Sequence, residues 1–378
     1  MVASLHAVRT QKSSFGSKRE PMKRSVSEIR VAGRSIGTGH PTYIVAEMSA
    51  NHNQSLDQAV ELIKLAKDAG ADAVKVQTYR PDTITIDCDN EYFRIKGTPW
   101  AGRTLYQLYE EAYTPWDWYP RLSEVASQLE LHLFSSPFDH SAVSFLEEMK
   151  VPAYKVASFE NIDLPLLRCI ARTGKPVILS TGMATLAEID EAVRTIGEAG
   201  GDELALLKCV SAYPAPPEEM NLRTIQNLAE SFAVPVGLSD HTLGISVPVA
   251  AVALGATIVE KHFTKSRAVP GPDSAFSLEP QEFKAMVDAV RTAERAIGGV
   301  TYEVAPGERA SRALRRSLFV VRSVAAGETF SEENVRSIRP GHGLHPRYME
   351  KVLGRRANRD IERGTPLDWD LVGTTDEV

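Results

Sequence analysis

Cysteine and long apolar runs are scarce in this sequence. The 378 residues include three cysteines, Cys88, Cys169 and Cys209, and no CxxC pair. Because an odd number of cysteines cannot all be bridged, the sequence favours the reducing environment of the cytoplasm. No run of about 18 apolar residues occurs, so no membrane span is expected. The basic N-terminal segment lacks the apolar core of a secretory signal, and we expect residues 1–30 to form a disordered tail.

An excess of positive charge is also absent. The net charge of −6 gives no electrostatic reason to expect a nucleic-acid partner. Hydrophobic residues make up 43% of the chain and charged residues 24%, which is typical of a soluble globular protein. Because 378 residues exceed one ordinary core, we expect a barrel-sized domain of about 250 residues and a smaller second domain.

Short apolar runs alternate with helical segments from residue 43 onward, which indicates a parallel sheet covered by helices. Eight such runs over about 220 residues predict a (β/α)8 TIM barrel. A doubly wound open sheet is the alternative, but no GxGxxG motif follows the first run. An aromatic-rich excursion at 78–118 is expected to build a pocket. The expected strands cover residues 43–46, 73–77, 131–134, 153–157, 176–179, 204–207, 234–238 and 257–260.

Two histidines follow consecutive strands of the expected barrel. His241 comes just after the strand at 234–238, and His262 comes just after the strand at 257–260. The helix-like segment 247–254 joins the two strands, so they run parallel and both histidines lie at the same end of the sheet. A lone histidine at such a place is usually a packing residue. Two at matching strand ends favour a metal site.

Two lysines interrupt apolar strands. Lys75 and Lys155 each need an anion, because burying an unpaired ammonium costs several kcal/mol. One interpretation is a structural ion pair with Glu47 or Glu160, which also follow strands. The other is a phosphate-like ligand held by both lysines and by nearby hydroxyls. The hydroxyls expected at the same rim are those of Ser158, Ser180 and Ser239.

A metal, a phosphate site and two carboxylates suit one reaction class. That class joins a phosphorylated enol to an aldehyde through a carbon–carbon bond. The metal polarises the aldehyde oxygen and a carboxylate handles protons. An amidohydrolase barrel is a rival interpretation, but it needs an HxH pair on the first strand, which here ends at Glu47. A binding protein without catalysis is a second rival, although it has no need of two lysines and two histidines together.

Seven motifs in order resemble the sialic acid synthase family. They are AEMSANHN, KVQTY, YKVASFE, LSTGM, GLSDHT, EKHF and PGPD, between Ala46 and Asp273. The resemblance extends from about residue 35 to about residue 371, and implies a transferase that condenses phosphoenolpyruvate with the aldehyde form of an N-acetylated amino sugar. The segments CDNEYFRIKGTPW and LYEEAYTPW resemble the pseudaminic acid branch, whose sugar is 2,4-diacetamido-2,4,6-trideoxy-altrose. A neuraminate or legionaminate synthase, acting on N-acetylmannosamine or a related sugar, is the alternative.

The resemblance also implies roles for individual residues. His241 and His262 are implied as ligands of Mn²⁺, with Mg²⁺ or Co²⁺ as alternatives. Glu47 and Glu160 are implied to contact the sugar or the reacting centre. The implied binders of phosphoenolpyruvate are Lys75, Lys155, Ser158, Ser180 and Ser239, with Gln77 close by. The implied sugar pocket contains Tyr213, Asp273 and Ser211, the last of which stands where neuraminate-type enzymes have asparagine.

The C-terminal part of the sequence has a different pattern of predicted secondary structure. After a barrel domain at 31–298 and a linker at 299–314, residues 315–378 show short β runs separated by glycines. The runs AAGETFSEENVRSIRPG and IERGTPL resemble the small SAF, or antifreeze-like, domain that closes these synthases. The resemblance implies a domain-swapped homodimer in which Arg339 reaches over the sugar bound to a partner subunit. A plain stability or dimerisation module is the alternative.

Overall fold

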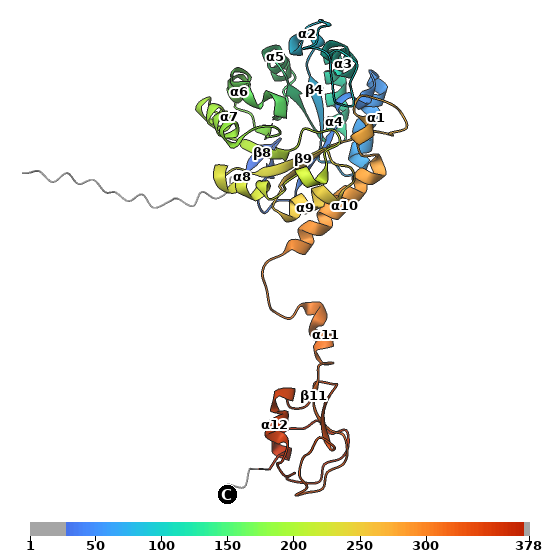
Figure 1. Ribbon diagram of the computed structural model, residues 1–378, viewed down its shortest axis with the longest axis vertical. Coiled ribbons are helices and arrows are strands. Elements are labelled where there is room, and N and C mark those ends of the chain that lie inside the picture. The colour runs from blue at the N-terminus through green and yellow to red at the C-terminus, as the bar shows by residue number, and fades with distance from the viewer. Residues whose placement is uncertain (1–27, 374–378) are drawn as a thin grey trace, which may run out of the picture. The chain divides into compact units, whose positions relative to one another are not determined.

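The computed structural model describes residues 28–373, and its first unit is a closed barrel of parallel strands (Figure 1). The last strand, β10, pairs with the first, β3, and His262 stands directly opposite Glu47. The predicted TIM barrel is therefore confirmed. Its strands are β3 (Tyr43–Glu47), β4 (Ala73–Thr78), β5 (His132–Pro137), β6 (Tyr154–Val156), β7 (Val177–Ser180), β8 (Leu204–Cys209), β9 (Val236–Asp240) and β10 (Ile258–His262).

Helices surround the strands, and most of them are amphipathic (Figure 1). In α1, Ala59, Leu62, Ile63 and Ala66 recur at helical spacing and are all buried. The Ser55 hydroxyl caps the start of this helix by accepting a hydrogen bond from the backbone N–H of Gln58. The outer layer consists of α1 (Leu56–Asp68), α4 (Tyr119–Gln128), α5 (His140–Glu148), α6 (Leu164–Ala171), α7 (Leu186–Glu198), α8 (Thr224–Phe232), α9 (Ser246–Ala253) and α10 (Pro280–Ile297).

A hairpin covers the N-terminal end of the barrel. Strands β1 (Ile29–Val31) and β2 (Arg34–Ile36) pair antiparallel, and their buried isoleucine and valine side chains join Tyr43 and Phe134 in one apolar cluster. The expected tail at 1–30 is therefore too long, because residues 29 and 30 belong to a strand. Residues 1–27 of that tail lie outside the described part of the chain.

The excursion after β4 has local structure of its own. It contains α2 (Pro81–Ile84), α3 (Leu105–Ala112) and the short 3-10 turn η2 (Trp116–Trp118). Trp100, which lies between α2 and α3, donates a hydrogen bond from Nε1 to the carbonyl of Pro272 at 2.8 Å. The excursion therefore contacts the loop that follows β10, on the side of the barrel where the strands end.

The chain divides into two compact units after Gly298. In the second unit, β11 (Ser317–Val320) pairs antiparallel with β12 (Val335–Ile338), and α12 (Met349–Val352) packs nearby. The segment before β11 contains the turns η6 (Pro306–Glu308) and α11 (Arg309–Arg312). Among the helices described in the two units, none is both long and apolar enough to span a membrane. The core of the second unit includes Leu318, Val320, Phe330, Val335, Val352 and Leu367.

Candidate active site

The carboxyl ends of the strands bring buried charges together. Lys75 Nζ lies 2.8 Å from Glu47 Oε2 and 3.6 Å from Glu260 Oε1, and all three side chains are buried. Burial alone lowers the pKa of Lys75, but the carboxylates of Glu260 and Glu47 outweigh it and raise the pKa. The ion pair considered above as a structural interpretation of Lys75 is therefore present. Glu260 was missed in the sequence, although its spacing of two from His262 places both side chains on one strand face.

Lys155 differs from Lys75 because it lacks a carboxylate at ion-pair distance among residues 28–373. Its ammonium is 1% exposed and donates to Ser180 Oγ at 2.6 Å and to the Val156 carbonyl at 2.8 Å. Burial lowers the pKa of this lysine. For Lys155, the interpretation as a structural ion pair with Glu47 or Glu160 is therefore not supported among the described residues, where no carboxylate lies at ion-pair distance from it. A buried ammonium with only neutral partners is suited to an anionic ligand.

Hydroxyl groups lie around the two lysines. Ser136, which the sequence did not single out, accepts a hydrogen bond from Lys75 at 3.3 Å. Ser239 donates to Glu260 Oε1 at 3.3 Å. Ser158 accepts from the backbone N–H of Gly182 at 3.1 Å, and a Cβ at Gly182 would collide with the hydroxyls of both Ser158 and Ser211. Glycine at this position therefore lets two serines approach the same point from neighbouring loops.

The two histidines meet as expected. The ring centroids of His241 and His262 are 5.3 Å apart. His241 Nδ1 lies 2.8 Å from the Val210 carbonyl, so this nitrogen donates and leaves Nε2 as the atom able to bind a metal. His262 Nδ1 is buried without a hydrogen-bond partner among the described residues. Burial lowers the pKa of His262 well below its ordinary value, which favours the neutral form that binds metals.

The histidine pair thus fits a divalent transition metal ion. Within residues 28–373 no third histidine, cysteine, aspartate or glutamate completes a cluster with them. The protein would therefore supply two ligands and leave the other positions to water or substrate.

A buried ion pair fixes the backbone beside both histidines. Lys261 Nζ lies 2.5 Å from Asp240 Oδ2 and also donates to the Thr242 carbonyl, and both charged side chains are fully buried. Asp240 Oδ1 accepts from the backbone N–H of Thr242 at 3.0 Å. Because these residues flank His241 and His262 in the sequence, one pair holds the ends of β9 and β10 together. Sequence reasoning missed this contact because the pairing of Lys261 with Asp240 joins two strands that are 21 residues apart in the sequence.

Carboxyl, amide and aromatic side chains complete the barrel mouth, which is the end of the barrel where the strands finish. Gln77 Nε2 donates to Glu47 Oε1 at 2.9 Å. Asp273 accepts a hydrogen bond from the Ser49 hydroxyl, and burial raises its pKa. The Tyr213 ring lies 4.3 Å from that of His241 and 5.5 Å from that of Trp100, measured between centroids. The excursion therefore brings Trp100 against Tyr213, and the pocket expected from it stays a prediction.

Glu160 is the residue of the barrel mouth whose pKa is best suited to proton transfer near neutral pH. Burial raises its pKa to about 7, and Oε2 has no hydrogen-bond partner among the described residues. A carboxyl that titrates near neutrality can accept and donate protons during turnover. Arg339, the remaining predicted site residue, belongs to the second unit, where its side chain is exposed.

Glu160 also predicts a pH dependence of stability. An unfolded glutamate titrates near its ordinary value of 4.5, whereas the pKa in the folded state is about 7. Between these values the folded state keeps a proton that the unfolded state has released, so the free energy of unfolding falls as pH rises. Glu160→Gln should lack this decline, and urea unfolding across the window measures it. Parallel stability curves for variant and parent would contradict the assignment.

Comparisons with known proteins agree with this geometry. Residues 62–302 match the NeuB family and residues 315–373 match the SAF domain. The chain is 47% identical to the pseudaminic acid synthase of Campylobacter jejuni, over 88% of this chain and 97% of the relative. It is 43% identical to the pseudaminic acid synthase of Helicobacter pylori, over 87% and 97%. The N,N'-diacetyllegionaminic acid synthase of Legionella pneumophila is 36% identical over 92% and 98%.

Solved structures show the same architecture. The crystal structure of the N-acetylneuraminic acid synthetase of Leptospira borgpetersenii serovar Hardjo-bovis matches with a TM-score of 0.68 and 32% identity, covering 75% of this chain and 95% of that one. The resemblance inferred from the sequence motifs is therefore confirmed. The chain belongs to the NeuB family and carries a SAF domain after its barrel.

Proposed function

We propose that this chain acts as a pseudaminic acid synthase, which condenses phosphoenolpyruvate, 2,4-diacetamido-2,4,6-trideoxy-altrose and water into a nine-carbon nonulosonic acid and phosphate. The observation that carries the proposal is the identity of 43–47% to pseudaminic acid synthases over almost their whole length. Identity to the legionaminic acid synthases is lower, at 36%. The three free cysteines suit the cytoplasm, where such precursors are made.

The lysine-rich side of the mouth is the proposed site for phosphoenolpyruvate. Lys155, buried without a carboxylate partner, would pair with the phosphate or carboxylate of this ligand. The hydroxyls of Ser158 and Ser180 would donate to its oxygens, as hydroxyls commonly do around phosphate, and Ser239 would do so by turning its proton away from Glu260. Ser136 and Lys75 complete this side of the site. The ligand would supply a counter-charge in direct contact with Lys155, whereas the Glu260 carboxylate acts on it from beyond ion-pair distance.

The histidine side of the mouth is the proposed site for the aldehyde. His241 and His262 would hold Mn²⁺, or Mg²⁺ or Co²⁺ in its place. When bound, such an ion supplies a Lewis acid for the aldehyde oxygen. Tyr213 and Asp273 would contact the sugar from one side, and Trp100 would close the pocket. Ser211 leaves more room than the asparagine of neuraminate-type enzymes, which fits a sugar with different substituents.

The proposed reaction has two bond-forming steps. C3 of phosphoenolpyruvate attacks the aldehyde carbon, whose oxygen gains a proton, and water adds to the cationic C2. The resulting tetrahedral intermediate expels phosphate through C–O cleavage and leaves the keto acid. Glu160, with a pKa of about 7, is the carboxyl best matched to donating the first proton. Glu47, held by Lys75 and Gln77, would orient the sugar or the water.

The choice of sugar is tested by phosphate release. Purified chain with phosphoenolpyruvate and Mn²⁺ should release phosphate with 2,4-diacetamido-2,4,6-trideoxy-altrose and much less with N-acetylmannosamine. A preference for N-acetylmannosamine would keep the fold and the mouth chemistry but would overturn the proposed substrate.

Arg339 is proposed to complete the site of a partner subunit in a domain-swapped homodimer. Its exposed guanidinium forms no ion pair with another described residue, so its planar fork is available for the carbonyl of an acetamido group. Arg339→Ala should raise the KM for the sugar by about tenfold, as for a lost charged hydrogen bond, while the KM for phosphoenolpyruvate stays unchanged. Equal effects on both substrates would contradict the role.

Subunit mixing tests whether Arg339 acts in trans. His241→Ala and Arg339→Ala chains each lack one part of the site, so each alone should be impaired. Co-refolding them in equal amounts should recover about a quarter of the wild-type sites, because half the dimers are mixed and one site in each is intact. No recovery in mixed dimers would place Arg339 within its own subunit. A monomer by light scattering would overturn the dimer.

A further inference from the structure

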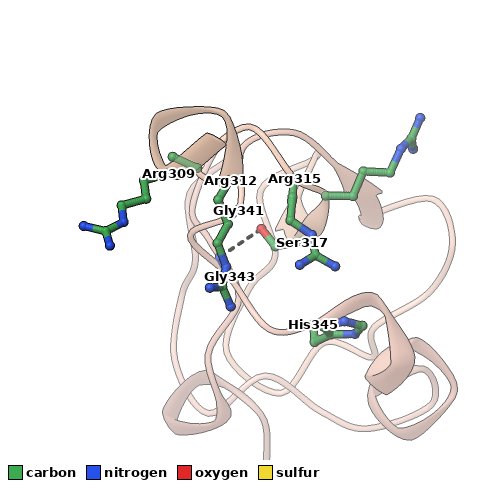
Figure 2. Close-up of a pocket in the computed structure, with 9 residues that line it drawn as sticks. Arg309, Arg312, Arg315, Ser317, Gly341, Gly343 and His345 are labelled. Atoms are coloured by element: carbon green, nitrogen blue, oxygen red, sulfur yellow. Dashed lines mark hydrogen bonds between the residues drawn. The ribbon is translucent and has the colours of Figure 1, made fainter. Parts of the chain in front are cut away.

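A hollow lined by arginines lies within the second unit (Figure 2). Its volume is about 360 Å³, which is enough for a small ligand, and no aspartate or glutamate lines it. Residues 299–373 carry 13 arginines and lysines against 10 aspartates and glutamates, whereas the whole chain is acidic. The lining residues are Arg309, Arg312, Ala313, Arg315, Arg316, Ser317, Gly341, Gly343 and His345.

The floor of the hollow is a fixed backbone arrangement. The buried Ser317 hydroxyl donates to the Pro340 carbonyl at 2.6 Å and accepts from the Gly343 N–H at 2.9 Å. Gly341 N–H donates to the Ala313 carbonyl at 2.9 Å. A Cβ at Gly343 would collide with the Leu318 carbonyl, so only glycine permits this close approach. The hollow is therefore built by tight contacts between two segments rather than by a loose surface loop.

The arginines at the rim are free of carboxylate partners. Arg309, Arg312 and Arg315 form no ion pair or hydrogen bond through their side chains with other described residues. Elsewhere in the same unit, Arg322 and Arg359 each pair with a carboxylate at 2.9 Å. Figure 2 shows Arg315 extending toward His345, Arg312 on the other side of Ser317, and Arg309 pointing away. Guanidinium groups gathered without counter-charge favour an anion between them.

We propose that this hollow binds a phosphate dianion, held by Arg312 and Arg315 above Ser317 and His345. The planar guanidinium fork matches phosphate oxygens in pairs, and two such forks offer more donors than a carboxylate needs. His345 Nδ1 accepts from Arg347, so Nε2 carries the proton and adds a donor. The ligand is free inorganic phosphate or the phosphate of a small monoester. All the lining residues belong to the second unit, and the proposal does not depend on the proposed reaction.

Arginine labelling with phenylglyoxal tests the site residue by residue. In the full chain, millimolar phosphate should slow labelling of Arg312 and Arg315 at least about fivefold, since protection follows occupancy. Arg336 and Arg363 are matched controls, because they are exposed in the same unit, have no ion pair there and lie outside the hollow. Chloride at equal ionic strength should not protect. Equal labelling of all four arginines with and without phosphate would overturn the proposal.

Two further arms identify the source of the phosphate and exclude general charge effects. Protection by glycerol phosphate as well as by inorganic phosphate assigns the site to monoesters, and protection by inorganic phosphate alone assigns it to the free ion. In equilibrium dialysis with radioactive phosphate, Arg312→Gln/Arg315→Gln should lose one bound phosphate per chain, while Arg336→Gln/Arg363→Gln keeps it. The same loss in both double variants would show charge screening and contradict a defined site.

Discussion

Replacing His262 with alanine is expected to lower turnover by about three orders of magnitude, because it removes one of the two proposed protein ligands of a Lewis acid worth several kcal/mol. His241→Ala should have the same effect. The fold should survive, because the Nδ1 of His262 has no hydrogen-bond partner to lose among the described residues. Phosphate release measures turnover, and Mn²⁺ binding by electron paramagnetic resonance should be lost in parallel.

His132 provides the matched control for this result. It lies at the opposite end of the barrel, where its Nδ1 is 2.7 Å from the Tyr43 hydroxyl. His132→Ala should therefore cost stability but leave Mn²⁺ binding unchanged. Wild-type activity in His262→Ala, or full activity of the parent after the metal is chelated, would contradict the role of the histidine pair.

Lys155→Met is expected to separate function from stability. The substitution removes a buried ammonium that has no carboxylate at ion-pair distance, so the free energy of unfolding should stay within about 1 kcal/mol of the parent value. Affinity for phosphoenolpyruvate should fall by one to two orders of magnitude, as for loss of a hydrogen bond between charged groups, about 1.5–3 kcal/mol. Isothermal titration with phosphoenolpyruvate and urea unfolding measure the two quantities.

Lys75→Met is the matched comparison, because the same substitution should here reduce the stability of the fold rather than mainly the affinity for phosphoenolpyruvate. It leaves Glu47 buried without the ammonium at 2.8 Å and removes one of the two lysine charges that stabilise Glu260, which should destabilise the fold by about 3–5 kcal/mol. If Lys155→Met unfolded as readily as Lys75→Met, Lys155 would be a structural residue. If it bound phosphoenolpyruvate normally, the ligand would lie elsewhere.

The barrel and its two histidines were predictable because they follow from local patterns. The order of the strands follows from the short apolar runs and the helical segments between them, some of which end at a glycine such as Gly70 or Gly255. Because the strands are parallel, His241 and His262 lie at the same end of the barrel. The hairpin of β1 and β2 was missed because its strands are three residues long. Its turn at Ala32 and Gly33, both with positive φ, was the available signal.

The sequence predicted which residues belong to the site better than it predicted the contacts between them. Lys75 and Lys155 look alike in the sequence, yet one meets two carboxylates and the other meets none. That difference depends on the register of neighbouring strands, which no local pattern reveals. Trp100 lies in an excursion without periodicity, so its position against Tyr213 depends on tertiary packing alone.

The central claim is that this barrel mouth joins phosphoenolpyruvate to an acetamido sugar aldehyde. The most direct measurement incubates the chain with Mn²⁺, 2,4-diacetamido-2,4,6-trideoxy-altrose and phosphoenolpyruvate carrying ¹⁸O in the bridging oxygen, and follows both products by mass spectrometry. The account predicts a nonulosonic acid in equal amount to phosphate, with the label in the phosphate, because water adds at C2 and the C–O bond breaks. Label retained in the sugar acid, or no phosphate with any acetamido sugar, would contradict it.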